Sequence, residues 1–231
     1  MIIRQTLKSD LKHMIREPII GLMFFVPIII SIVFKLADLY LVPVIEMNFS
    51  VDIGFYYIYI LSAIFVISAD MIGVVIGFMM LDDKDGHILE LISVTPLGKN
   101  GYLINRLGFM SIFTFIFTFV SYFILNIVRI PFYTLVFIAL MLSIISASIG
   151  ILLSSLATDK VKGLTYAKGL NFIVVFCFAD LIDIEYIRII SAIFPTYWIT
   201  SIMGNPYGVE PYIFGLITTV FWFSVLKRTV T

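Results

Sequence analysis

Long apolar stretches separated by short polar segments recur six times along the chain. A membrane-spanning helix needs roughly 20 mainly apolar residues to cross about 30 Å of hydrocarbon. The pattern therefore predicts an all-α membrane protein, with six transmembrane helices in a single transmembrane domain that covers residues 1–231. The predicted spans lie at about residues 19–36, 54–81, 107–128, 132–157, 164–182 and 212–226, and the last is the shortest.

Residues 1–17 combine apolar and basic positions at helical spacing. A helix of this kind lies in the plane of the membrane interface, with its cations at the lipid headgroups. Pro18 then changes the direction of the chain before the first span. We expect an interfacial amphipathic helix that either anchors the chain and sets its topology or transmits motion to the bundle. One face carries Ile3, Leu7, Leu11, Met14 and Ile15, and the other carries Arg4, Lys8, Lys12 and Arg16.

The segment 184–208 is apolar but broken by Pro195, Gly204, Pro206 and Gly208. Irregular backbone survives at membrane depth only where it packs on protein or faces a wet cavity. We therefore expect a re-entrant segment, formed by two helix fragments that enter the membrane from one side before the last span. Its aromatic residues Tyr197 and Trp198 fit an interfacial belt, and alternatively they touch a transported compound.

The polar segment 82–97 between the second and third spans predicts a short amphipathic helix. Gly86 permits a turn out of the preceding span, and Pro96 disfavours the helical conformation at Thr95 and ends the helix. Asp82, Asp83 and Asp85 suit the positive end of this helix's dipole. A short helix with nothing of its own to pack against fits either a groove on a partner protein or the membrane surface. Its apolar side carries Ile88, Leu91, Ile92 and Thr95.

Asp70 lies near the middle of the second predicted span. A charge at the centre of a bilayer costs roughly 2.5–3.5 kcal/mol on insertion scales, so Asp70 should face the interior of the bundle. It shares a helix face with Ala63, Gly73 and Gly77, and the Gly-x-x-x-Gly spacing allows close helix approach. Asp70 is either a polar point in a transport path or a structural hydrogen-bonding residue.

A similar face of small residues lies on the fourth predicted span. We expect the small faces of the second and fourth spans to pack on each other, within one chain or across a dimer. The residues of this second face are Ser143, Ala147, Gly150 and Ser154.

Composition supports the membrane class, because 61% of the 231 residues are hydrophobic and only 13% are charged. Soluble domains are about half apolar and about a quarter charged, so lipid must cover part of this surplus. The formal net charge is zero, which argues against a nucleic-acid partner. Cys177 is the only cysteine, which excludes an intrachain disulfide and a thiolate metal cluster. No cleavable signal peptide is expected, because the first turns are amphipathic.

The distribution of Lys and Arg predicts the orientation of the spans. With the N-terminus inside, the inner segments hold most of the 15 basic residues and the outer segments hold three. We therefore expect a multi-pass protein of the plasma membrane with both termini in the cytoplasm. The outer basic residues are Lys35, Arg129 and Arg188, and the inner ones are Arg4, Lys8, Lys12, Arg16, Lys84, Lys99, Arg106, Lys160, Lys162, Lys168, Lys227 and Arg228.

No motif of a known catalytic site occurs in the sequence. A phosphate-binding loop, a His-Glu-x-x-His zinc helix and a Gly-x-Ser-x-Gly nucleophile elbow are all absent. The two histidines, His13 and His87, lie 74 residues apart in the sequence and are not expected to bind a metal together. We therefore expect no enzyme activity and no cofactor in this chain.

The segment 73–106 resembles the permeases of the type-2 ABC exporter family, and among them most closely the drug-exporting, fluoroquinolone-exporter-like branch. In that family a similar run forms the coupling helix that docks on the ATPase. Phe194-Pro195-Thr196 is similar to the family's re-entrant region. This chain departs from the family pattern at His87 and Asn105. The matching positions are Glu90, Leu91, Val94, Thr95, Pro96 and Leu97, with Tyr102 at the start of the third span.

The resemblance implies a permease subunit of an ATP-driven exporter that moves an amphipathic or hydrophobic drug, lipid or peptide out of the cell. Its partners would be a separate ABC ATPase that carries ATP and Mg²⁺, a second permease copy (identical or a sister chain) and the lipid bilayer, with no nucleic acid. Asp70, Tyr197 and Trp198 are candidate transport-path residues. The candidate ATPase-coupling residues are Gly86, Ile88, Glu90, Leu91, Ile92, Thr95 and Pro96.

Two other functions remain possible from the sequence. A non-transporting membrane immunity or partner-binding protein would have the same bundle without a docking helix. An ion-coupled secondary carrier would use Asp70 as its coupling site and would carry inverted repeats. The halves 1–115 and 116–231 show no convincing similarity to each other.

Overall fold

The computed structural model describes residues 18–49, 52–86, 88, 98–182 and 184–228. Within these residues all regular structure is helical, and six helical segments are long and apolar enough to cross a membrane. The predicted all-α membrane protein with six spans is therefore confirmed. The interfacial helix predicted for residues 1–17 lies outside the described residues, as does most of the loop that follows Gly86.

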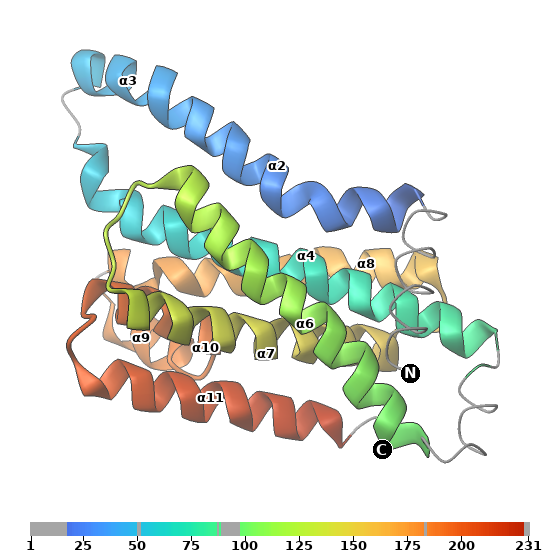
Figure 1. Ribbon diagram of the computed structural model, residues 1–231. Helices are drawn as coiled ribbons and strands as arrows, with labels where there is room; N and C mark the ends of the chain where they lie inside the picture. Colours follow the sequence, from blue (N-terminus) through green and yellow to red (C-terminus); the bar gives the residue numbers. More distant parts are fainter. Residues whose placement is uncertain (1–17, 50–51, 87, 89–97, 183, 229–231) are drawn as a thin grey trace.

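Figure 1 shows the helices running side by side as an elongated bundle. A bent pair of short helices, α9 and α10, precedes the last span, and the helix α3, which the hydropathy pattern did not predict, follows the first. The helices are α2 (Pro18–Tyr40), α3 (Val42–Phe49), η1 (Ile53–Tyr56), α4 (Tyr57–Asp85), α6 (Gly98–Leu125), α7 (Phe132–Leu156), α8 (Lys160–Leu170), η2 (Asn171–Leu181), α9 (Glu185–Ser191), α10 (Pro195–Gly204) and α11 (Val209–Lys227).

Several predicted boundaries differ from the structure; the second span was expected to end at Leu81, but α4 continues to Asp85. The third span was expected to begin at Leu107, but α6 begins at Gly98, and Tyr102 and Arg106 near its start bond to Asp83 at the end of α4. The last span begins three residues earlier than expected, at Val209. The fifth span changes at Asn171 from the α-helix α8 to the 3-10 helix η2, a change that hydropathy does not report.

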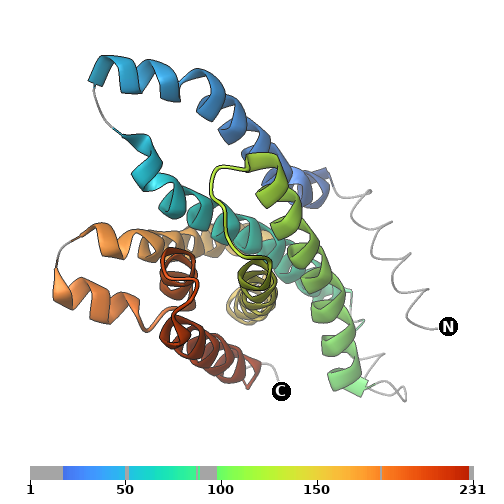
Figure 2. The same cartoon turned by 60° about the vertical axis from the view of Figure 1, so that its left-hand side comes forward.

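Helix α4 is the centre of the bundle. In its most apolar stretch 89% of the residues are buried inside the protein, against 67% for α7 and between 17% and 33% for the other four spans. Figure 2 shows α7 (olive) lying between α4 (cyan), α6 (green) and α11 (red). The remaining spans form an outer shell whose apolar side chains are widely exposed, as lipid contact requires.

Glycines set the close contact between α4 and α7. A Cβ atom added at Gly73 would lie 2.7 Å from Cβ of Ile149, and one added at Gly150 would lie 2.4 Å from Cγ2 of Ile76. A Cβ atom added at Gly77 would collide with the side chain of Leu153 in the same way. Close approach gains van der Waals contact, which drives helix association where lipid removes the hydrophobic effect between helices. Within one chain, α4 and α7 thus approach closely at Gly73, Gly77 and Gly150, whereas Ser143 and Ala147 of the predicted α7 face line a cavity toward α6 and α11.

The other small residues on α7 contribute differently. Ala147 is buried and lines a cavity between α6, α7 and α11. Ser154 is half-buried, and its hydroxyl donates to the carbonyl of Ile151 in its own helix. Hydroxyl contacts also join α7 to α6, where Thr114 Oγ1 donates to Ser146 Oγ at 2.9 Å. Small and hydroxylated residues thus bring α7 close to its neighbours on more than one side.

Replacing Gly150 with alanine should destabilise the bundle. The added methyl group has no room against Ile76, so α4 and α7 must separate, and such overpacking costs about 1–3 kcal/mol. The matched control is Gly108→Ala in α6, where an added Cβ meets no atom within 4 Å. Thermal unfolding in detergent should show a lower Tm for Gly150→Ala alone. Equal Tm values for the two variants would contradict this account of the contact.

Candidate functional site

The end of the bundle where α4 stops and α6 starts carries the candidate coupling residues. We call it the loop end; α2 begins there at Pro18, and α11 ends there at Lys227 (Figure 1, right-hand side). Gly86 closes α4, with its N–H donating to the carbonyl of Asp82 at 2.9 Å. Ile88 is 39% exposed, and its role in coupling stays a prediction. The remaining coupling candidates, Glu90, Leu91, Ile92, Thr95 and Pro96, lie outside the described residues.

A buried polar cluster joins the two helices that flank this loop. Asp83 lies in the last turn of α4 and is only 5% exposed, while Tyr102 and Arg106 on α6 are 6% and 7% exposed. The Tyr102 hydroxyl donates to Asp83 Oδ2 at 2.5 Å, and Arg106 Nε donates to the same oxygen at 3.1 Å. The terminal nitrogen Nη2 of Arg106 also donates to it. Charge-assisted bonds of this kind fix the end of α4 against α6.

The neighbouring residue Asp82 joins α4 to a third helix. Its Oδ1 pairs with Nζ of Lys160, the first residue of α8, at 2.8 Å. Gly163 lets α8 come close at this point, because a Cβ there would lie 2.8 Å from the ring of Phe78 on α4. Two consecutive aspartates therefore fix the end of α4 to two different helices.

Helix α8 begins with a side-chain cap at the same end of the bundle. Asp159 accepts a hydrogen bond from the backbone N–H of Lys162 at 2.9 Å. This bond holds the pKa of Asp159 below its usual value, so the carboxylate stays charged and suits the positive end of the helix dipole. The turn between α7 and α8 is thereby held in a defined shape beside the end of α4.

The sequence analysis did not find the Asp83 cluster. It assigned Asp82, Asp83 and Asp85 to the start of a loop helix, whereas they form the last turn of α4. That assignment was wrong because hydropathy ends a span at its first charges, and a buried ion pair lets the helix continue beyond them. The four-residue spacing of Tyr102 and Arg106, two polar residues on one face next to the loop, was the available signal.

Asp70 is placed where the sequence analysis expected it, inside the bundle. It is 2% exposed, and neither carboxylate oxygen has a hydrogen-bond partner among the residues that the structure describes. A buried polar group without a partner is costly, so such a residue calls for an explanation beyond packing. The structure thus leaves Asp70 as a candidate for a functional role at the centre of α4.

Tyr197 and Trp198 have partners other than Asp70. The Tyr197 hydroxyl donates to Asp180 at 3.0 Å, and Asp180 also pairs with Arg188 at 3.6 Å. Trp198 stacks on Phe214 of α11, with the ring centroids 5.3 Å apart. These contacts join the short helices to η2 and α11, so both side chains have structural roles in addition to the transport role that remains a prediction.

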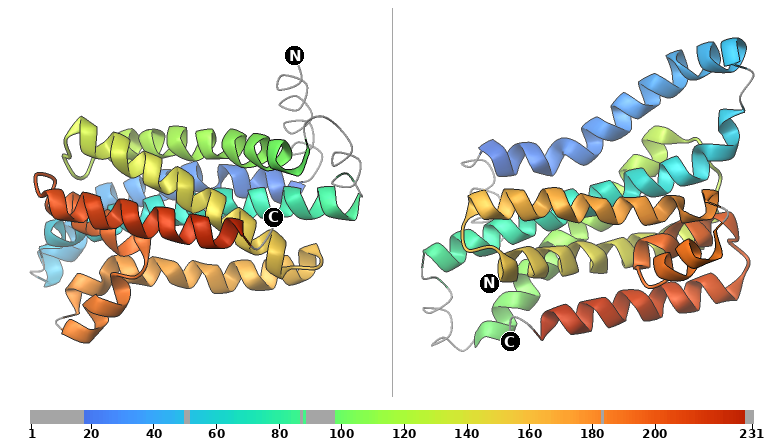
Figure 3. Two further views of the ribbon diagram at one scale, coloured as in Figure 1. Left: turned by 90° about the horizontal axis from the view of Figure 1, so that it is seen from below. Right: turned by 180° about the vertical axis from the view of Figure 1, so that it is seen from behind.

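The helix pair α9 and α10, predicted to be a re-entrant segment, bends by 112° (Figure 3). The bend leaves the backbone carbonyls of Ala192 and Ile193 outside helical hydrogen bonding. Trp198 Nε1 donates to the carbonyl of Ala192 at 2.8 Å, and Trp222 Nε1 donates to that of Ile193 at 2.9 Å. These are the two tryptophans of the chain. Their indole groups donate hydrogen bonds to backbone carbonyls at the break between the two helices.

Removing one member of the Asp83 cluster should be strongly destabilising. Arg106→Gln leaves the Asp83 carboxylate buried with no cation, a change that costs about 3–5 kcal/mol. The double variant Asp83→Asn/Arg106→Gln should recover part of the loss, because no unpaired charge remains. Unfolding of the wild type, the single variants Asp83→Asn and Arg106→Gln and the double variant in detergent, analysed as a double-mutant cycle, measures the coupling. Additive effects of the two substitutions on the free energy of unfolding would show that the interaction between Asp83 and Arg106 contributes nothing to stability.

Comparison with known proteins identifies the family. No curated protein and no solved structure matches this chain. The family model described as "Fluoroquinolones export permease protein Rv2686c-like" matches residues 10–227 of the 231 residues. This match includes all six candidate spans, the loop after α4 and the bent helix pair α9–α10. The chain therefore belongs to the Rv2686c-like family of export permeases.

Proposed function

We propose that this chain is the transmembrane subunit of an ATP-driven ABC exporter, and that the 86–97 loop is its contact with a separate ATPase. The observation that carries the proposal is the buried Asp83–Arg106 pair, which joins the two helices from which the loop extends. A loop that receives force needs such a rigid base, because force applied to a freely hinged loop would be lost in local motion. Membership of an export permease family supports the same conclusion.

Force at the loop would reach the rest of the protein through α4. The Asp83 and Asp82 pairs link the end of this helix to α6 and α8, and its glycines hold it against α7. Since α4 is the most buried span, a shift of this helix must displace its neighbours. ATP binding and hydrolysis, with Mg²⁺, would take place on the ATPase and change the shape of the path through this motion.

The remaining parts of the proposal concern orientation, assembly and cargo. The excess of Lys and Arg at the loop end favours a cytoplasmic location for that end and for both chain termini in the plasma membrane. A second permease, identical or a sister chain, would complete the transport path. The family description names fluoroquinolones, so drugs of that class are the first cargo to test.

Affinity purification of the tagged chain from its native membrane tests the ATPase contact. An ABC-type ATPase should co-purify with the wild-type chain, and Glu90→Ala or Pro96→Ala should reduce its recovery and uncouple ATP hydrolysis from transport. Membrane insertion should be unchanged. The matched control is Glu210→Ala, an exposed carboxylate in the first turn of α11, away from the loop end. Failure to recover any ATPase, in detergents that preserve known complexes, would reject the proposal.

A second candidate function is an ion-coupled carrier, and the buried Asp70 without a partner favours it. Asp70→Asn keeps the size of the side chain and removes its charge. In an ATP-driven exporter the variant should change the range of cargoes and leave expression and ATP dependence intact. In a carrier it should abolish the dependence of transport on an ion gradient.

The Asp70 test is read from efflux of several compounds in membrane vesicles. Separate measurements with ATP alone and with an ion gradient alone distinguish the two energy sources. Glu210→Gln serves as the control for removal of a carboxylate from an exposed position. Unchanged efflux of all the compounds in the Asp70→Asn variant would remove Asp70 from the transport path.

A further inference from the structure

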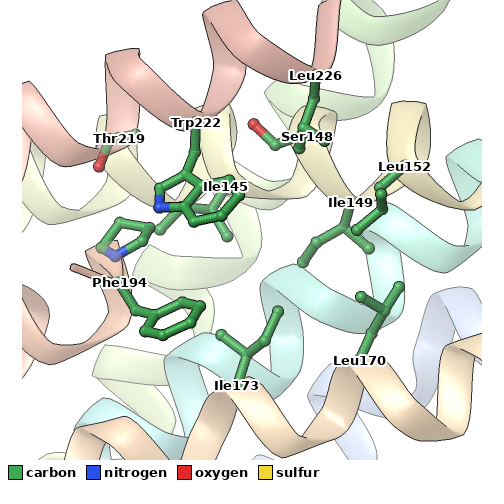
Figure 4. A pocket seen from close by; sticks show the side chains of 11 residues that line it. Ile145, Ser148, Ile149, Leu152, Leu170, Ile173, Phe194, Thr219, Trp222 and Leu226 are labelled. Atoms are coloured by element: carbon green, nitrogen blue, oxygen red, sulfur yellow. The ribbon is translucent and has the colours of Figure 1, made fainter. Parts of the chain in front are cut away.

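A partly enclosed cavity of about 260 Å³ lies between α7, the α8–η2 helix, α11 and the start of α10. Figure 4 shows its lining from close by, with Trp222 and Leu226 from α11 facing Leu170 and Ile173 across the space. Trp222 and Leu226 belong to the last turns of α11, so the cavity lies in the half of the bundle nearer the loop end.

The lining restricts the chemistry of what can enter. None of its side chains is charged, and Ser148 and Thr219 are its hydroxyl-bearing residues. Ser148 already donates to the carbonyl of Ile144 at 2.8 Å, and Thr219 donates to that of Gly215 at 2.7 Å. A polar or charged group placed here would lose its water without gaining a donor, at a cost of kilocalories per mole. The cavity therefore suits an uncharged, apolar group.

One wall of the cavity is flat and aromatic. The rings of Phe194 and Trp222 are nearly parallel, at an interplanar angle of 12° and a centroid distance of 5.8 Å. Phe176 continues the stack behind Phe194, at 7° and 4.1 Å. The hydrogen bond from Trp222 to Ile193 fixes the indole in this plane. A flat aromatic ligand would extend this stack, and offset stacking would add to the binding free energy that burial of its apolar surface provides.

The volume of the cavity indicates the size of the ligand group. A cavity of roughly 150 Å³ lined by aliphatic and aromatic side chains holds one benzene molecule. The volume here is larger by about the space of a second fused ring. A flexible lipid chain would fit the volume, but it would gain little from a rigid stack of parallel rings.

We propose that this cavity is a binding subsite for the flat, fused two-ring aromatic part of an exported compound, which stacks on Trp222. The choice of ligand rests on the proposed export function, and the polar substituents of the compound would remain outside the cavity. Neither the site nor its residues were predicted from the sequence, because its walls come from helices far apart in the chain.

Binding can be measured on the permease alone, in nanodiscs, by energy transfer from its tryptophans to the fluoroquinolone norfloxacin. Both tryptophans, Trp198 and Trp222, are retained as donors, because Trp198 bonds to the bend between α9 and α10. Ser148→Leu should fill the cavity and raise the Kd of norfloxacin about tenfold, because part of one ring of the ligand could then no longer be buried. Ile173→Phe fills the same space from the opposite wall and provides a second variant if Ser148→Leu fails to fold.

The matched control is Ser155→Leu, the same substitution on the same helix. Its hydroxyl also donates to a carbonyl of its own helix, at 2.8 Å, but Ser155 is exposed and does not line the cavity. This variant should bind norfloxacin as the wild type does. An unchanged Kd in folded Ser148→Leu or Ile173→Phe, or no binding to the wild-type permease, would overturn the proposal.

Competition identifies the occupant. 2-Naphthol should displace norfloxacin, whereas 2-decalol, which has the same skeleton without aromatic rings, should compete at least about tenfold less well. Equal competition by 2-decalol or by dodecanol would overturn the aromatic assignment in favour of a lipid chain. The assay needs no ATPase, so its failure is distinct from a failure of the export function. ATP-driven efflux that persists when the cavity is filled would reject the subsite alone.

Discussion

The close contact of α4 with α7 is the constraint on which the rest of the structure depends. Lipid solvates an apolar helix as well as another apolar helix does, so the bundle is held by close packing and by hydrogen bonds between helices. Gly73, Gly77 and Gly150 allow that packing where larger side chains would collide with the partner helix. Once α4 is held there, the other spans cover it, and its central carboxylate at Asp70 is removed from water and lipid.

The electrostatics of α4 explain why its end is fixed to two helices. The C-terminal end of a helix carries a partial negative charge, and α4 places Asp82, Asp83 and Asp85 there. This arrangement is unfavourable for α4 alone and becomes favourable when Arg106 and Lys160 approach from α6 and α8. The acidic residues therefore act as attachment points for neighbouring helices, and they make the base of the 86–97 loop rigid.

Features that depend on local sequence were predictable, and features that depend on distant residues were not. Span positions follow from runs of apolar residues, and the break before the last span follows from Pro195 and its neighbours. The early start of α6 depends on a pairing of Arg106 with Asp83, 23 positions away. Likewise, the hydrogen bond from Trp222 to Ile193 joins residues 29 positions apart. The sequence analysis placed Arg106 from the distribution of basic residues and predicted no hydrogen-bond partner for Trp222, because neither charge bias nor hydropathy contains information on such partners.

The bend between α9 and α10 connects the buried centre of the bundle to the apolar cavity. Trp222 both bonds to the carbonyl of Ile193 at the bend and forms the aromatic wall of the cavity. Helix α10, which follows the bend, packs on α4, where the Ser62 hydroxyl lies 3.9 Å from the sulfur of Met203. A shift of α4 would therefore move α10 and, through the bend, change the position of the stacked rings. In the proposed exporter, a force applied at the 86–97 loop would reach the cavity through the packed helices α4 and α10, without direct contact between the two sites.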